Sequence, residues 1–142
     1  MAVGGWHRSD AWVFVSVVIA DRTERDRASS AGLPLTGATL ADVLSAAGFL
    51  HSSVPGRQEL EAAIRRLIGA GLILVGDDSF EVATAGERLW RTRPFSGLSA
   101  AVDTVHTVLN RASAPGSSPW TLDEQSYTAA VREYSARVAE SS

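Results

Sequence analysis

The stretch from Arg57 to Trp90 constrains the fold of this chain more than any other. Apolar residues recur in its first part at intervals of three and four, which predicts an amphipathic helix built on Leu60, Ala63, Ile64, Leu67 and Ile68. Gly69 and Gly71 mark the end of that helix. Two short apolar runs follow, and they are separated by turn residues, Gly76, Asp77, Asp78 and Ser79. This pattern predicts a β-hairpin over residues 72–83.

Capping patterns place one helix after the hairpin and another before the first helix. Thr84 and Glu87 match a capping box, in which the two side chains satisfy free amides at a helix start. Thr39 and Asp42 form a second such pair ahead of a helix over 40–51, whose apolar face holds Leu40, Val43, Leu44, Ala47 and Leu50. The segment 52–56 is then expected to be a turn that leads into the helix over 57–70.

These residues resemble the winged helix-turn-helix module of MarR-like and PadR-like bacterial regulators. Residues 66–73, RLIGAGLI, match a phrase that commonly ends a helix in those families. Thr84 and Gly86 resemble the T-x-x-G phrase after the wing, with one residue between them instead of two. The resemblance covers residues 39–92 and implies a DNA-binding regulator of transcription, with residues 40–51 as its support helix and 57–70 as its recognition helix. Because one fold hosts many activities, the residues themselves must still be weighed.

The apolar run at residues 11–20, AWVFVSVVIA, precedes this motif. Its β-branched residues favour a strand by local propensity, whereas a helix that is apolar on all sides is expected where it is buried on all sides. Because winged helices begin with a helix packed across the motif, we predict a helix starting at Asp10, and a buried strand remains the alternative. Trp12 and Phe14 are expected in the core. The polar residues 23–36 predict a loop.

Two further helices are predicted in the C-terminal part, on either side of a linker at residues 113–119. Their apolar seams repeat at four, three and four residues, and they comprise Leu98, Val102, Val105 and Leu109 in one helix and Tyr127, Val131, Tyr134 and Val138 in the other. A capping box at residues 121–124 opens the second helix. Such seams pack on each other, on the first helix or on a second subunit. We predict a homodimer.

The predicted fold class is therefore mainly α with one small β-hairpin: a winged helix-turn-helix with extra N- and C-terminal helices. The chain of 142 residues is predicted to be a single domain, 1–142, with a winged-helix core at 10–92 and a helical extension at 97–140 that dimerises. The run at 11–20 is about half as long as a bilayer-spanning helix, and cysteine is absent. We expect a cytoplasmic protein without a membrane partner.

Catalytic and metal-binding patterns are absent from the sequence. His7, His51 and His106 lie far apart and share no metal-ligand spacing. No phosphate-binding glycine loop or nucleophile elbow occurs either. We therefore expect no enzyme, no metal and no cofactor. A small ligand held near Trp12, Trp90 or Trp120 is a minor alternative.

The predicted recognition helix carries residues that suit DNA. The candidates on its outward side are Arg57, Gln58, Glu61, Arg65 and Arg66. Arg and Gln suit guanine and adenine edges, and Arg also grips phosphates. The wing turn, Gly76 to Ser79, is unfavourable, because Asp77 and Asp78 place negative charge where a wing meets the DNA backbone.

Charge weakens the DNA-binding hypothesis without excluding it. From Arg57 to Arg93 six arginines face six acidic residues, and the whole chain carries a net charge of −3. DNA binding depends on clustered positive charge. We therefore predict a dimeric DNA-binding transcriptional regulator whose partner is double-stranded DNA. The alternative is a winged-helix interaction module that binds a protein partner and no DNA.

Overall fold

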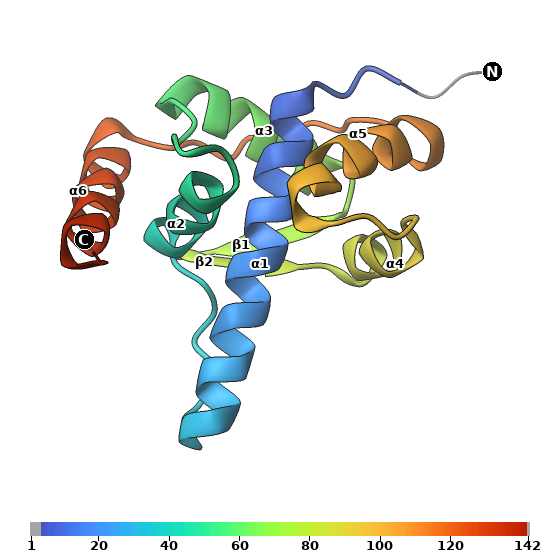
Figure 1. The fold of residues 1–142 in the computed structure, drawn as a ribbon. Coiled ribbons are helices and arrows are strands. Elements are labelled where there is room, and N and C mark those ends of the chain that lie inside the picture. The colour runs from blue at the N-terminus through green and yellow to red at the C-terminus, as the bar shows by residue number, and fades with distance from the viewer. Residues whose placement is uncertain (1–3, 142) are drawn as a thin grey trace.

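The computed structural model describes residues 4–141, which form a mainly helical fold with one small hairpin (Figure 1). The elements in chain order are α1 (Arg8–Ala31), α2 (Leu40–His51), α3 (Arg57–Gly69), β1 (Ile73–Gly76), β2 (Ser79–Val82), α4 (Thr84–Thr92), the 3₁₀ turn η1 (Leu98–Ala100), α5 (Ala101–Ala112) and α6 (Glu124–Ser141). β1 and β2 pair antiparallel. Between α1 and α2, the carbonyl oxygen of Ala38 accepts a hydrogen bond from the amide of Phe80 at 2.8 Å. Helix, bridge, helix, helix and hairpin therefore follow in the order that the predicted winged helix requires.

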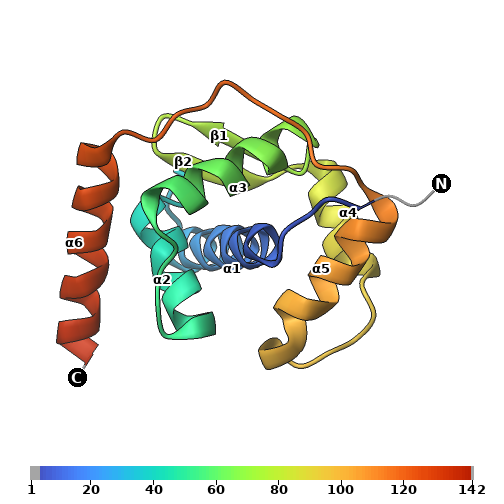
Figure 2. The same cartoon turned by 90° about the horizontal axis from the view of Figure 1, so that it is seen from above.

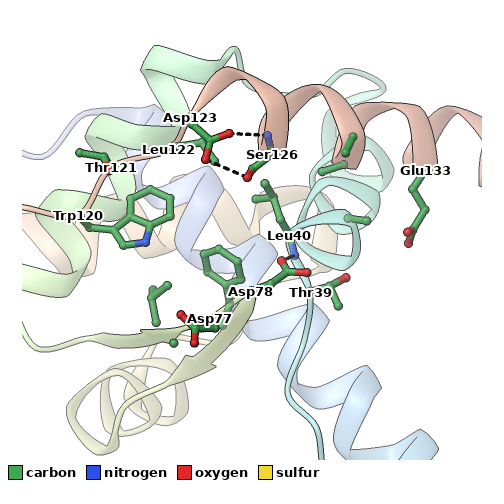
Figure 3. A pocket seen from close by; sticks show the side chains of 16 residues that line it. Thr39, Leu40, Asp77, Asp78, Trp120, Thr121, Leu122, Asp123, Ser126 and Glu133 are labelled. Carbon is green, nitrogen blue, oxygen red and sulfur yellow. Dashed lines mark hydrogen bonds between the residues drawn. The ribbon is translucent and has the colours of Figure 1, made fainter.

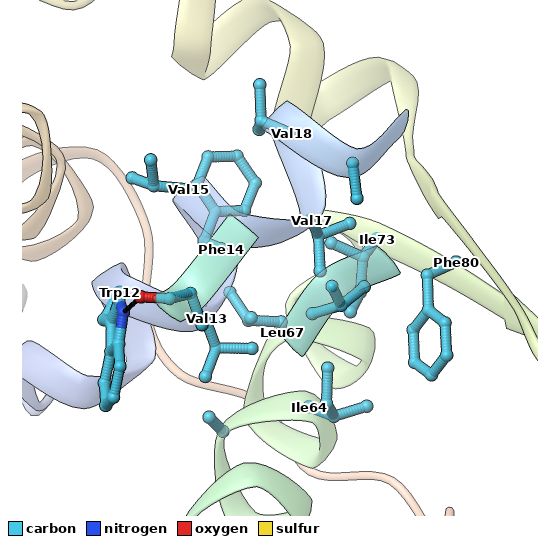
Figure 4. Close-up of a cluster of buried hydrophobic side chains, with 14 of the residues drawn as sticks. Trp12, Val13, Phe14, Val15, Val17, Val18, Ile64, Leu67, Ile73 and Phe80 are labelled. Atoms are coloured by element: carbon cyan, nitrogen blue, oxygen red, sulfur yellow. Dashed lines mark hydrogen bonds between the residues drawn. The ribbon is translucent and has the colours of Figure 1, made fainter. Parts of the chain in front are cut away.

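α1 is the centre of the core, and residues 11–20 are helical rather than extended (Figure 2). Val13, Phe14 and Val17 are each at most 1% exposed. α1 is surrounded by α2, α3, α5 and the hairpin, and Figure 4 shows Val13 and Val17 on the side of Leu67 and Ile73. Burial on all sides explains why the segment is apolar at every position, and it overrides the strand propensity of its valines.

The loop predicted at residues 23–36 is wrong over most of its length, because α1 continues to Ala31. Charged side chains pair along the helix in this part: Arg25 lies 2.9 Å from Asp21, and Arg27 lies 2.7 Å from Glu24. Both carboxylates are buried against the rest of the fold. Residues three and four apart are neighbours on a helix surface, so these charge pairs stabilise α1 instead of interrupting it.

Two of the three predicted capping boxes are displaced. The box at the start of α2 is confirmed, with the amide of Asp42 donating to Thr39 at 3.2 Å and the amide of Thr39 donating to Asp42 at 2.8 Å. At α4 the cap is Ala83 and Thr84 is already helical, because the strand leads directly into the helix. At α6 the capping side chain is Asp123, which accepts the amide of Ser126 at 2.7 Å.

Candidate nucleic-acid interface

α3 turns one face to the core and presents a charged row on the other. Its buried face consists of Leu60, Ala63, Ile64 and Leu67. Arg57, Glu61 and Arg65 follow one another at intervals of four residues and are only partly buried, with side chains that are 30%, 18% and 40% exposed. Glu61 lies within 3.5 Å of Arg57 and 3.8 Å of Arg65. We call these three residues the α3 row.

Residues 113–123, which we call the strap, run across this face of α3 on their way from α5 to α6 (Figure 2). Arg57 Nη1 donates to the carbonyl oxygen of Leu122 at 2.8 Å, and Arg65 Nε donates to that of Trp120 at 2.6 Å. The amide of Leu122 in turn donates to Glu61 Oε2 at 2.7 Å. Residues 113–119 were expected to be a linker, and they do lack helix and strand. The hydrogen bonds to the α3 row come from the residues that follow, Trp120 and Leu122.

Two glycines let the strap lie against the end of α3. The amide of Gly116 donates to the carbonyl oxygen of Arg66 at 3.2 Å. A Cβ atom added at Gly69 would lie 2.0 Å from the amide nitrogen of Ser117, and one added at Gly116 would lie 2.1 Å from the carbonyl carbon of Gly69. No side chain fits at such distances, so the fit between strap and helix depends on both glycines.

The other two candidates on α3 have different surroundings. Arg66 Nη1 lies 2.5 Å from Asp10 Oδ1, and Asp10 is fully buried. Arg66 therefore neutralises a core carboxylate, and the expectation that it grips phosphate does not match its position. Gln58 is exposed on the first turn of α3, where a side chain could meet a base edge.

The wing turn has two unpaired residues instead of four, and one of them stabilises α2. Asp77 and Asp78 are its two central residues, between the paired Gly76 and Ser79. Asp78 has a left-handed backbone (φ 49°), and its Oδ1 accepts the amide of Leu40 at 3.0 Å. It thus caps the first turn of α2, a role that acidic and amide side chains fill well. Asp77 is exposed.

A pocket of about 520 Å³ opens between the wing turn, the start of α2, the strap and the first turns of α6 (Figure 3). Phe80 and Trp120 meet edge to face on its apolar side, with ring centres 6.2 Å apart. The described residues that line it include four carboxylates and no basic side chain; the carboxylates are Asp77, Asp78, Asp123 and Glu133. The amide of Ser126, which donates to Asp123, holds the pKa of that carboxyl below its usual value. This side of the hairpin repels phosphate.

The seam of α5 packs inside the chain. Val102, Val105 and Leu109 are buried where α5 lies along α1, and Leu98 alone among the four seam residues is largely exposed. α1 therefore packs against α5 as well as α2 and α3, which agrees with the apolar run at residues 11–20. α5 therefore buries most of its seam without a second subunit.

The seam of α6 packs on α2 of the same chain. The hydroxyl of Tyr127 donates to the carbonyl oxygen of Pro55 at 2.8 Å, and burial raises the pKa of that phenol. Tyr134 lies directly against Gly48, where an added Cβ would be 2.3 Å from its hydroxyl oxygen. Val131 is half-buried, and Val138 is 50% exposed. The homodimer stays a prediction, to be tested by sedimentation against the chain mass of 15.0 kDa.

The structure brings together neither the tryptophans nor a metal site. Trp12 donates to the carbonyl oxygen of Ala47 at 3.2 Å, Trp90 lies under the guanidinium of Arg93 at 3.5 Å, and Trp120 contacts Phe80. Within residues 4–141, no group of three His, Asp or Glu side chains could hold a metal ion. Over the same range, every helix is too short or too polar to cross a bilayer.

Comparison with protein-family models, with curated proteins and with solved structures gives no match to this chain. The class that the structure defines is a mainly helical fold with one hairpin, in the element order of a winged helix. The α3 row, the strap and the wing turn are the features of the chain that bear on its function.

Proposed function

We propose that this chain is a winged-helix DNA-binding regulator of transcription in which α3 meets the DNA. The observation that carries the proposal is the α3 row, which directs the guanidinium groups of Arg57 and Arg65 away from the core toward oxygen acceptors. The oxygens that they contact belong to the strap. DNA phosphates and base edges offer acceptors of the same kind, and with phosphate the hydrogen bonds gain the attraction of opposite charges.

The alternative, an interaction module without DNA binding, is favoured by a different observation. The strap shows that the α3 row can bind the backbone of an extended polypeptide, through two carbonyl oxygens and one amide. The carboxylates around the neighbouring pocket also oppose DNA on that side. A protein partner that replaces the strap on α3 would then be the ligand.

The two functions make opposite predictions for a mobility-shift titration at two salt concentrations. As a regulator, the chain binds duplex DNA more weakly at the higher salt, because each neutralised phosphate releases counterions. Arg65→Ala weakens binding to all sequences alike, whereas Gln58→Ala changes base preference by about 1–3 kcal/mol at one position.

The wing offers an independent check on the same titration. Asp77→Asn removes an exposed charge and is expected to tighten binding if the wing approaches the DNA backbone. The matched change at Asp78 is unsuitable, since that carboxylate caps α2. If no variant binds random duplex at low salt, including the variants that free α3 described below, the regulator proposal is lost. The interaction module then takes its place.

A further inference from the structure

We infer that the strap is an autoinhibitory cover, which must leave α3 before this face can bind DNA. The inference rests on the proposed function. Arg57 and Arg65 cannot donate the same N–H groups to strap carbonyls and to DNA at once. Strap and DNA are therefore competing ligands of the α3 row.

The contacts between the strap and α3 are of a kind that can open locally. Its contacts with α3 include hydrogen bonds at partly exposed side chains. Within the described range Leu122 is its one buried apolar residue, and Trp120 is half-buried against Phe80. Ser117, Pro119 and Thr121 are exposed. Segments with few buried apolar contacts are the ones that open locally without global unfolding. Release also uncovers the ring of Phe80 that Trp120 contacts, so opening gives up a small part of the core.

Charge adds to the steric cover. Residues 113–142 contain four acidic residues and two arginines, a net charge of −2, so residues 1–112 carry the remaining −1 of the total of −3. Asp123 is the one charged residue of the strap, and the other charges of this stretch lie on α6, which packs on α2. Movement of the strap away from α3 would free Arg57 and Arg65 from neutral carbonyl partners.

The consequence for affinity follows from mass action. When only the open form binds, the apparent dissociation constant equals the intrinsic constant divided by the open fraction. A substitution that raises the open fraction without touching the α3 row must therefore tighten DNA binding by the same factor. The fit between strap and helix supplies such a substitution.

Gly69→Ala is the variant of choice. The added methyl group collides with the backbone of Ser117, at 2.0 Å from its nitrogen and 2.4 Å from its oxygen, while alanine suits the last turn of α3. Gly116→Ala makes the same collision from the strap side, 2.1 Å from the carbonyl carbon of Gly69. Gly97→Ala is the matched control, because the nearest atom to its new methyl group is 4.0 Å away.

Release of the strap is measured separately from DNA binding. The amides of Leu122 and Gly116 donate to α3 in the closed form, so their hydrogen exchange reports opening. We expect exchange at these two amides to become at least about ten-fold faster in Gly69→Ala and Gly116→Ala, and to be unchanged in Gly97→Ala. Binding of random duplex at low salt should tighten about ten-fold in the first two variants alone.

The outcomes separate this inference from the proposed function. Faster exchange with unchanged affinity for DNA overturns the cover and leaves the regulator intact. Faster hydrogen exchange with no DNA binding by any variant overturns the regulator proposal, and with it the inference that the strap covers a DNA-binding face. Unchanged exchange in both glycine variants shows that the strap does not depend on this fit, and overturns the cover. Faster exchange with tighter binding supports both.

Discussion

Replacing Arg66 with Ala is expected to destabilise the fold by about 3 kcal/mol, at the lower end of the range for breaking a buried ion pair. Arg66 Nη1 lies 2.5 Å from Asp10 Oδ1 and is the one ion-pair partner that the described residues give this carboxylate. Asp10 is fully buried, and its other oxygen accepts the amide of His7 at 2.8 Å at the start of α1. Without Arg66 a charge remains in the core, partly offset by the helix dipole.

Urea unfolding followed by circular dichroism checks this result, and the neighbouring arginine supplies the control. Arg65→Ala removes the same side chain one position earlier, where it is 40% exposed and bonded to the strap, and should cost below about 1 kcal/mol. Adding Asp10→Asn to Arg66→Ala should recover part of the loss, because the amide carries no charge. Equal losses for the two arginines would contradict the assignment of Arg66 to the core.

Local patterns predicted much of this fold because local chemistry dictates it. The bounds of α2 follow from its apolar face and from Thr39, whose hydroxyl caps it. The hairpin follows from Asp77 and Asp78 between two apolar runs. The predicted first helix was too short, because the polar and charged composition of residues 23–31 is also typical of a loop. In this part of α1 the acidic and basic side chains pair with one another, and the acidic partners Asp21 and Glu24 are buried. Composition alone does not reveal these pairs.

The candidate site was predicted only in part. The outward position of Arg57, Glu61 and Arg65 follows from helical spacing, and the structure places them there. The strap was missed, because an extended segment rich in serine, proline and glycine has no periodicity that tells where it docks. Gly69 and Gly116 were the available signal, yet a glycine at a helix end is ordinarily explained by the end itself. Contacts between residues so far apart in sequence are fixed by packing rather than by local preference.

Gly86→Ala tests the junction between hairpin and α4, where the glycine resembles that of the T-x-x-G phrase. The residue is buried in the first turn of α4, and an added Cβ would lie 2.1 Å from the carbonyl oxygen of Leu72. That oxygen accepts the amide of Ala83 at 3.0 Å, and this hydrogen bond fixes it at the end of the hairpin opposite the turn. The methyl group therefore meets backbone that cannot move without breaking this hydrogen bond.

We expect Gly86→Ala to lower the free energy of unfolding by about 3 kcal/mol, the upper end for overpacking. Helix propensity alone would raise it by about 1 kcal/mol, so the sign of the change separates the two effects. Gly97→Ala, in open space before η1, should stay within about 0.5 kcal/mol of the parent. A Gly86→Ala chain as stable as the parent would mean that α4 stands farther from the hairpin than 2.1 Å implies. This contact would then not be the reason for a glycine at position 86.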